Sequence, residues 1–443
     1  MEYKDFLEKV EQSRTNCEIF CGPISLPRMR RVQQLFPRDE VADIAATVRA
    51  ELEASGMKAK IKKGGRIAVC AGSRGLASLP VLVKATVDWV REAGGDPFVM
   101  PAMGSHGGAT AQGQADMLDT LGVNEKTVGA PIVSHMETRI IGTAKEGFPV
   151  HMSVDILDSD GCIFVCRVKP HTAFRGTYES GFMKMLAIGA GKHNGALVAH
   201  HQGFGAFSEM IPKIGQCALE NAPIIGGVGS IENAFYKVAK VKALRADQFM
   251  SDEPALLQEA FRFMGQIIPT DLDVLLVDEI GKNFSGDGMD PNISGTFATP
   301  YGSGGVKADN RVVFALSEET HGNATGLGMA DFTVPKVFRE FDPITTYTNA
   351  MTARVTAIAK MPLVMPDEYT AYRMAIHRSV RPGAHQSPRV VHIDNTEQVE
   401  FINVSEGLWP EVEQDERLKF VTEPFEYQFD GKGEIVRSWK KPH

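Results

Sequence analysis

The segment 66–101 constrains the fold more than any other part of the chain, because strand, loop, helix and strand signals follow one another there. Arg66–Ala71 (RIAVCA) is a short apolar run typical of a buried strand, and Leu79–Glu92 has apolar residues at helical spacing. The letters AGGDP end that helix in the manner of a glycine C-cap, and 98–101 reads as the next strand. This βαβ order predicts a parallel sheet in an α/β fold.

A second region of strand and helix signals begins near residue 270, where the apolar run 272–278 favours another buried strand. Further strand-like or helical segments follow at 311–316, 345–360, 366–378, 389–393 and 399–404. We therefore expect two α/β domains with parallel-type sheets and an active-site cleft between them. Residues 1–268 are expected to form an N-terminal catalytic and cofactor domain, and 269–394 a C-terminal α/β domain.

The composition narrows the class of protein. The chain has 47 Lys and Arg against 55 Asp and Glu, a net charge of −8, which argues against broad nucleic-acid binding. No apolar run reaches the ~20 residues of a membrane span, and the charged N-terminus resembles no signal peptide. The six cysteines contain no C-x-x-C pair and are predicted to be reduced. We expect a cytoplasmic protein without nucleic-acid or membrane partners.

Several familiar catalytic motifs are absent from the sequence. The glycine-rich stretch 187–193 (AIGAGKH) lacks both the first glycine and the final Ser or Thr of a phosphate-binding P-loop. No G-x-G-x-x-G follows a strand, and no H-E-x-x-H zinc motif occurs. These absences disfavour a nucleotidase, a Rossmann dehydrogenase and a self-contained zinc hydrolase.

The segment 167–201 gathers histidines, lysines and glycines close to an expected strand end. His171 follows the strand predicted at 161–168, and His106 follows the strand at 98–101. Ligands bind at this edge of open α/β sheets, where two imidazoles can act as an acid–base pair near neutral pH. Lys184 is a candidate nucleophile or covalent anchor if it is buried. For each of these residues, an ordinary surface or core role is the alternative.

Taken together, the motifs resemble the nickel-dependent lactate racemase family. The resemblance covers most of the chain and is strongest over about 65–205, where five features share the family's order and spacing. They are a strand-end Ser-Arg, a Gly-Ser-His loop, a second strand-end His, a Ser-Gly-x-x-Lys turn and a downstream His. The resemblance also implies that the segment from about 395 to 443 returns to the N-terminal domain.

Matching the motifs residue by residue implies a role for each. His106 and His171 would be the catalytic acid–base pair, and Lys184 would carry the cofactor covalently. The cofactor would be a nickel-pincer nucleotide, a Ni(II) pyridinium thioamide/thiocarboxylate mononucleotide. Ser73 and Arg74 would bind it, with Arg74 also near the substrate. The nickel ligand would be His200, with His201 as the open alternative.

The sequence departs from the family pattern around the substrate. Ala71 stands at the family's aspartate, Gly75 at its proline, and Phe182 at the second glycine of the Ser-Gly-Gly-x-Lys turn. The candidate substrate contacts are Arg74, Arg175, Tyr178, Lys282 and Asn283. These departures favour a 2-hydroxy acid other than lactate, larger and more polar, such as a sugar acid.

The expected function is therefore that of an isomerase, a racemase or epimerase of a small anionic 2-hydroxy acid. The resemblance implies reversible hydride transfer between substrate and cofactor, and it implies cofactor-synthesis enzymes as partners. Two alternatives stay open: a non-catalytic carrier of the cofactor, and an oxidoreductase with an exchangeable cofactor. A homo-oligomer is also an open alternative.

Overall fold

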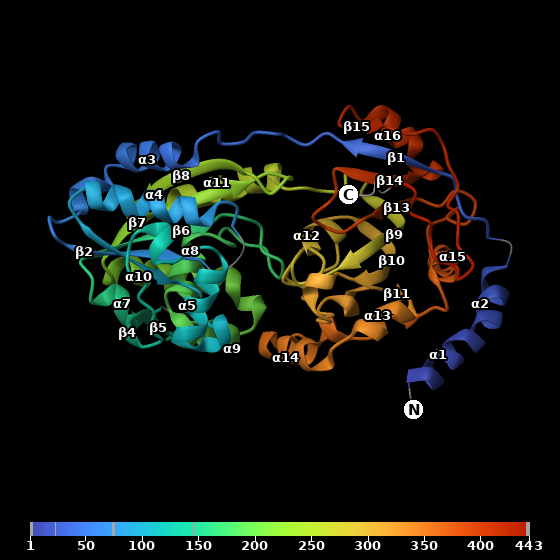
Figure 1. Ribbon diagram of the computed structural model, residues 1–443, viewed down its shortest axis with the longest axis horizontal. Coiled ribbons are helices and arrows are strands. Elements are labelled where there is room, and N and C mark those ends of the chain that lie inside the picture. Colours follow the sequence, from blue (N-terminus) through green and yellow to red (C-terminus); the bar gives the residue numbers. More distant parts are fainter. Residues whose placement is uncertain (1–2, 23, 73–75, 145–146, 440–443) are drawn as a thin grey trace. The chain divides into compact units, whose positions relative to one another are not determined.

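The chain forms two compact units, which we call the central unit (37–264) and the terminal unit (1–36 with 265–443). The computed structural model describes residues 3–22, 24–72, 76–144 and 147–439 (Figure 1). No helix within these ranges is long and apolar enough to cross a membrane.

The central unit is built on a five-stranded sheet with the order β3-β2-β6-β7-β8. Its first four strands are parallel, and β8 is antiparallel to β7. The strands are β2 (Arg66–Ala71), β3 (Asp96–Pro101), β6 (Gly161–Arg167), β7 (Ile224–Glu232) and β8 (Val238–Arg245), with a separate hairpin of β4 (Thr138–Thr143) and β5 (Pro149–Ser153). The helices are α3 (Ile44–Ser55), α4 (Leu79–Glu92), α5 (Ala111–Thr120), α6 (Glu125–Val128), α7 (Val154–Leu157), α8 (Phe182–Lys184), α9 (Lys192–His201), α10 (Phe207–Asn221) and α11 (Phe249–Phe263). Short turns are the 3-10 turns η1 (Met57–Lys60), η2 (Gly107–Ala109), η4 (Phe204–Ala206) and η5 (Ala246–Gln248), and the π-helical turn η3 (Met185–Gly189).

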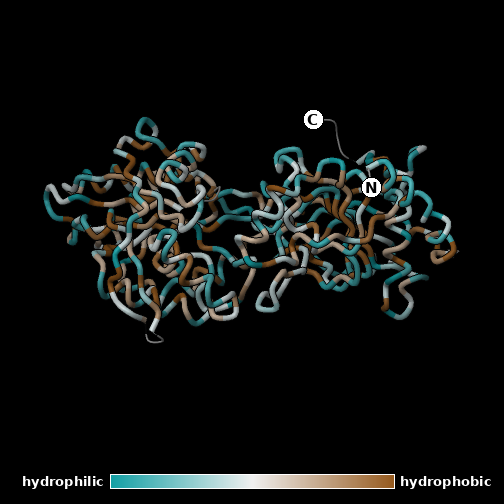
Figure 2. The backbone as a smooth tube through the Cα atoms, turned by 90° about the horizontal axis from the view of Figure 1, so that it is seen from below, coloured by the Kyte–Doolittle hydropathy of each residue, from teal (hydrophilic) through white to brown (hydrophobic). Residues whose placement is uncertain are grey.

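Helices cover both faces of this sheet, because alternate strand residues point to opposite sides. Along β2, Ala68 and Cys70 belong to one apolar cluster, together with residues of α10 and α11. Ile67 and Val69 belong to the other, together with residues of α3 and α4. Figure 2 shows hydrophobic segments running through the interior of the unit. The α/β class and the parallel sheet predicted from the sequence are confirmed.

The terminal unit contains an eight-stranded mixed sheet with the order β12-β11-β10-β9-β13-β14-β1-β15. The strands from β12 to β13 are parallel, and β14, β1 and β15 are each antiparallel to the preceding strand in this order. The strands are β1 (Met29–Gln34), β9 (Asp271–Ile280), β10 (Lys307–Leu316), β11 (Phe332–Thr333), β12 (Leu363–Val364), β13 (Val390–Ile393), β14 (Phe401–Ser405) and β15 (Leu418–Phe420). The helices are α1 (Tyr3–Gln12), α2 (Arg14–Cys21), α12 (Pro291–Ser294), α13 (Pro335–Glu340), α14 (Pro343–Ala353), α15 (Glu368–Arg378) and α16 (Trp409–Gln414), with 3-10 turns η6 (Glu318–Thr320), η7 (Leu327–Met329), η8 (Thr356–Ala359) and η9 (Glu406–Leu408).

The division into units differs from the expected domains at both ends of the chain. Residues 1–36 were expected in the N-terminal domain, and 395–443 were expected to return to it. Both segments belong to the terminal unit instead. The reason is strand pairing: β1 lies between β14 and β15, so both chain ends complete the terminal sheet (Figure 1). Such long-range pairing leaves no local signal in the sequence.

A buried polar network also fastens the C-terminal segment to the terminal sheet. His392 on β13 lies 2.8 Å from Asp278 on β9 and 2.7 Å from the Tyr427 hydroxyl. Asn403 donates to the same hydroxyl at 3.1 Å, and Arg437 donates to Asp278 at 2.7 Å. Burial raises the pKa of Tyr427, so its hydroxyl stays protonated within this network.

Candidate functional site

The candidate residues of the central unit follow neighbouring parallel strands at their carboxyl ends. His106 lies in the loop after β3, and His171 lies four residues after β6 ends. Strand β2 lies between β3 and β6 in the sheet. The residues that follow β2 in the sequence, Ser73, Arg74 and Gly75, lie outside the described residues. The edge that the sequence analysis selected therefore carries both histidine loops, as expected for a ligand-binding edge of an open α/β sheet.

The loop that carries His171 is fixed by one buried carboxylate. Glu179 accepts a hydrogen bond from the His171 backbone N–H at 2.6 Å and another from Gly176 N–H at 3.2 Å. It also pairs with Arg175, whose guanidinium donates to the His171 carbonyl at 2.7 Å. Burial raises the pKa of Glu179, while these backbone bonds and Arg175 oppose the rise. Arg175 and Glu179 thus form the frame of the loop.

His171 and His200 lie at one cluster of aromatic rings. The His171 ring centroid is 4.5 Å from Phe174 and 6.3 Å from Phe204. The His200 ring is 5.6 Å from Phe204 and 5.3 Å from Phe207, and Phe174 and Phe207 are 5.4 Å apart. The structure therefore brings these two predicted histidines to the same group of side chains, whereas His201 is exposed.

The turn that carries Lys184 is held from α11. Glu253, which is almost fully buried, accepts a hydrogen bond from Met183 N–H at 2.9 Å. Burial raises the pKa of Glu253 to about 8, and the backbone bonds from Met183 and Phe182 partly offset the rise. Gly181 is required here, since a Cβ at this position would collide with the Glu253 carboxylate. Lys184 itself is partly buried at the end of α8.

Phe182, a departure from the family pattern, is accommodated by the surrounding structure. Its ring stacks on Phe249 with the centroids 4.4 Å apart. A Cβ on Gly227 would lie 2.5 Å from the Phe182 ring, and a Cβ on Gly229 would lie 2.8 Å from it. The two glycines of β7 therefore leave room for the ring, and the turn forms with phenylalanine in place of glycine.

The glycines that follow Lys184 allow close contacts between neighbouring segments of backbone. A Cβ on Gly189 would lie 2.7 Å from the Ala102 carbonyl oxygen, and one on Gly191 would lie 2.9 Å from the Gly195 Cα. Gly104 in the His106 loop donates its N–H to the Gly189 carbonyl at 3.1 Å. The glycine-rich stretch that resembles a phosphate loop thus forms a close contact between η3 and the His106 loop.

The remaining predicted substrate contacts have partners of their own. The Tyr178 hydroxyl is directed to the Met250 carbonyl at 2.7 Å, and the residue is buried. In the terminal unit, Lys282 donates to the Gly286 carbonyl at 2.8 Å. Asn283 accepts from Ser317 at 2.6 Å, at the carboxyl ends of β9 and β10. Their roles toward a substrate stay predictions.

The described residues hold no protein-only metal centre. No group of three or more His, Cys, Asp or Glu side chains within the described ranges could bind a metal ion. A metal at His200 would need most of its ligands from another source.

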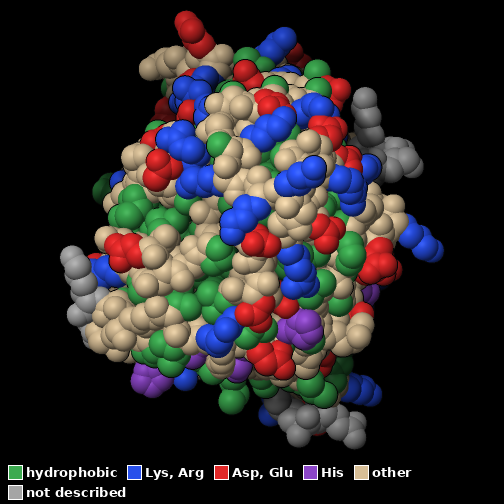
Figure 3. All heavy atoms as spheres, turned by 90° about the vertical axis from the view of Figure 1, so that its left-hand side faces the viewer, with side chains coloured by type: hydrophobic (Ala, Val, Ile, Leu, Met, Phe, Trp, Pro, Cys, Tyr) green, Lys and Arg blue, Asp and Glu red, His purple; other side chains and the backbone are tan. Residues whose placement is uncertain are grey.

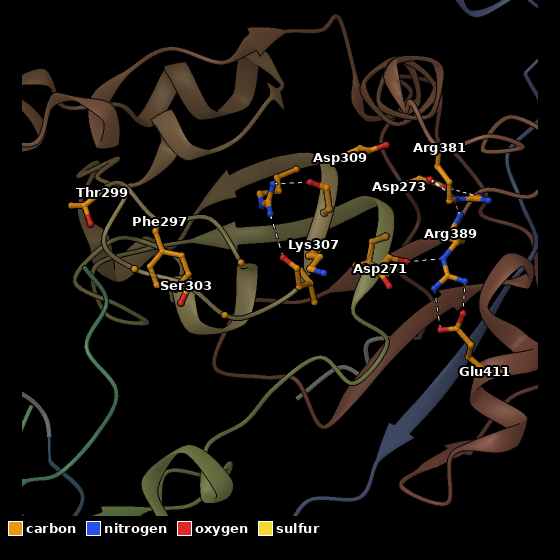
Figure 4. Close-up of a pocket in the computed structure, with 17 residues that line it drawn as sticks. Asp271, Asp273, Phe297, Thr299, Ser303, Lys307, Asp309, Arg381, Arg389 and Glu411 are labelled. Carbon is orange, nitrogen blue, oxygen red and sulfur yellow. Dashed lines mark hydrogen bonds and ion pairs between the residues drawn. The ribbon is translucent and has the colours of Figure 1, made fainter. Parts of the chain in front are cut away.

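A cavity of about 910 Å³ lies in the terminal unit, and none of the predicted site residues lines it. It is found at the amino ends of β9 and β10 and is lined by Lys307, Arg381 and Arg389, among others (Figure 4). Arg381 pairs with Asp273, and Arg389 pairs with Glu411. Because these arginines already have carboxylate partners, the cavity offers no evident anion site. On one face of the central unit, cationic and anionic side chains are interspersed (Figure 3).

No protein-family model matches the chain, and no curated protein matches it. Among solved structures, the lactate racemase apoprotein from Thermoanaerobacterium thermosaccharolyticum is similar with a TM-score of 0.45 and 12% sequence identity. The match covers 79% of this chain and 90% of that chain. At these values the similarity concerns the fold alone and assigns no family.

Several buried residues that shape the site were missed by the sequence analysis. Glu179 holds the His171 loop and Glu253 holds the Lys184 turn, and Lys192 and Gln114 are hydrogen-bonded behind the His106 loop. Lys192 was noted only as part of a failed P-loop. Glu253 and Gln114 are polar residues within helices, and only tertiary contacts distinguish them from solvated side chains.

Proposed function

We propose that the protein is a racemase or epimerase of a 2-hydroxy acid that uses a nickel-pincer nucleotide attached to Lys184. One observation carries the proposal. A single crossover, from β6 to β7, presents His171, Lys184 and His200, and the adjacent loop after β3 presents His106. These are the residue types that the resemblance requires: two proton carriers, an anchoring amine and a metal ligand.

The donor set is compatible with this cofactor. His200 packs against the Phe204 and Phe207 rings and would offer one nitrogen ligand to the metal. Its partial burial, compared with the exposed His201, favours His200 as the nickel ligand. When bound, the cofactor would supply the hydride acceptor and donor, a chemistry that no side chain provides.

A backbone hydrogen bond fixes which nitrogen of the neutral His171 ring carries the proton. Its Nδ1 accepts the Ala173 backbone N–H at 3.0 Å, so in the neutral ring Nε2 carries the proton. We assign this nitrogen to protonation of the substrate oxygen, with His106 as the opposite base. Glu179 and Arg175 hold the loop in place while the proton moves.

The substrate shell favours an acid other than lactate. Arg74 and Arg175 would provide positive charge for the carboxylate. Tyr178 would supply a polar contact for a further hydroxyl group, as in a sugar acid. Turnover of lactate at rates well above those of polyol acids would contradict this part of the proposal.

The test is chiral chromatography of single enantiomers of 2-hydroxy acids, incubated with protein co-expressed with the cofactor-synthesis enzymes and nickel. We expect racemisation or epimerisation that falls at least ~100-fold in His106→Asn and His171→Asn. His385→Asn, at an exposed histidine of the terminal unit, is the matched control and should retain activity. Unchanged turnover in His106→Asn would contradict the acid–base role of His106, whereas loaded protein that turns over none of the acids would favour the carrier alternative.

A further inference from the structure

Lys192, the first residue of α9, is buried completely and has a defined pair of acceptors. Its ammonium donates to the Pro101 carbonyl at 2.6 Å and to the Gln114 side-chain oxygen at 3.1 Å. Its backbone adopts φ +53°, a left-handed conformation that is uncommon for lysine. Such a conformation persists where the surrounding contacts determine it.

Gln114 passes this contact on to the His106 loop. Its amide nitrogen donates to the Gly104 carbonyl at 2.9 Å and to the His106 carbonyl at 3.2 Å. The amide orientation is fixed, because the oxygen must face the ammonium and the nitrogen must face the two carbonyls. Gln114 is itself fully buried, and its bonds to the Gly104 carbonyl and to Lys192 lie out of competition with solvent.

We propose that Lys192 is a positioning residue that, through Gln114, holds the His106 loop against the helix that carries His200. The proposal rests on the proposed function for the roles of these two histidines. It does not make Lys192 a catalytic residue, because no part of the side chain is exposed and its ammonium is committed to the carbonyl and amide oxygens. A displacement of His106 by ~1 Å is enough to reduce turnover ~100-fold.

The surroundings of Lys192 make the contact sensitive to pH. Burial lowers its pKa to about 8, and the facing groups Asp155 on α7, Cys70 on β2 and Glu137 before β4 oppose the fall. Asp155 is in turn bonded to His135 at 2.6 Å. Above pH 8 the ammonium loses a proton and its charge, so the charge-assisted bonds weaken. The loop should therefore loosen as pH rises through about 8.

The first test is hydrogen exchange of the apo full-length protein, comparing the loop 102–110 with α4 as an internal reference. In Lys192→Met, we expect the protection factors of the loop amides to fall at least ~10-fold, while those of the α4 amides stay unchanged. After correction for intrinsic exchange, protection of the loop should fall between pH 7 and 9 in the wild type but not in Lys192→Met. Lys62→Met, at an exposed lysine outside both the loop and α4, is the control. Equal loop protection in Lys192→Met and the wild type would overturn the proposal.

A second variant keeps the test decisive if Lys192→Met does not fold. Gln114→Glu retains an acceptor for the ammonium but removes the donors to the Gly104 and His106 carbonyls. We expect this variant to fold and to lose loop protection. Unchanged protection in Gln114→Glu would overturn the proposal.

Turnover of the loaded enzyme separates positioning from a general structural role. We expect the Gln114→Glu enzyme to keep its Lys184 adduct and its KM within about 3-fold, while kcat falls ~10- to 100-fold. A parallel loss of adduct and turnover would overturn the proposal. If the wild type carries no adduct, the proposed function fails, but exchange in the apo protein still decides the positioning role of Lys192.

Discussion

Glu253 should make the free energy of unfolding depend on pH, an effect that can be measured without any cofactor. Its carboxyl group is buried under the Lys184 turn, accepts the Met183 N–H at 2.9 Å, and has its pKa raised from 4.5 to about 8 by burial. The folded chain therefore holds this proton over a pH range in which the unfolded chain releases it. The stability that this bound proton gives the folded chain is fully present below pH 4.5 and is lost as pH rises through about 8.

The size of the effect follows from the two pKa values. Between pH 5 and pH 8 the raised pKa of Glu253 lowers the free energy of unfolding by about 3 kcal/mol. Glu253→Gln removes the titration while keeping an oxygen that can accept the Met183 N–H. The stability of this variant relative to the wild type should therefore increase by about 3 kcal/mol across the same interval.

The assay is urea unfolding of the central unit from pH 5 to 9, followed by the fluorescence of its buried tryptophan. Trp89 becomes the sole tryptophan when Trp409 and Trp439 are replaced by Phe, since the chain has three. Glu209→Gln, on an exposed glutamate of α10, is the control and should follow the wild-type curve. Parallel stability profiles for the wild type and Glu253→Gln between pH 5 and 8 would refute the reasoning.

Three further substitutions probe the frame around the site and the terminal unit. Gly181→Ala places a Cβ against the Glu253 carboxylate and should cost ~1–3 kcal/mol in urea unfolding, a cost that a second Glu253→Ala change should reduce. Glu179→Gln should weaken the anchor of the His171 loop by ~1–3 kcal/mol, seen as faster exchange of the His171 amide; unchanged exchange would contradict it. Tyr427→Phe removes the hydroxyl that joins a buried histidine and asparagine and should lower terminal-unit stability by ~1–3 kcal/mol in urea unfolding, whereas no loss would show that the network is energetically neutral.

The elements that the sequence predicted best are those with strong local signals. Arg66–Ala71 and Leu79–Glu92 have the expected bounds, because the apolar run, the helical periodicity and the glycine C-cap all lie within the segment itself. The parallel sheet followed from the βαβ order. By contrast, β1 depends on partners nearly 400 residues away, at 401–405 and 418–420, and no local pattern could indicate this pairing.

The candidate site was predictable only in part, for the same reason. The sequence indicates the positions of His106 and His171 after two strands, because both follow apolar strand signals. The residues that hold their loops, among them Lys192 and Glu179, acquire their roles only through burial and distant contacts. Phe182 departs from the family pattern in the sequence, but Gly227 and Gly229 on β7 leave room for its ring.

The most direct test of the central claim is mass spectrometry of the intact protein and its peptides after co-expression with the cofactor-synthesis enzymes and nickel. The account predicts a covalent nucleotide adduct on the peptide that contains Lys184, absent in Lys184→Ala and retained in the control Lys84→Met. Protein without an adduct, under conditions that load an established lactate racemase, would contradict the proposed cofactor and the racemase function with it.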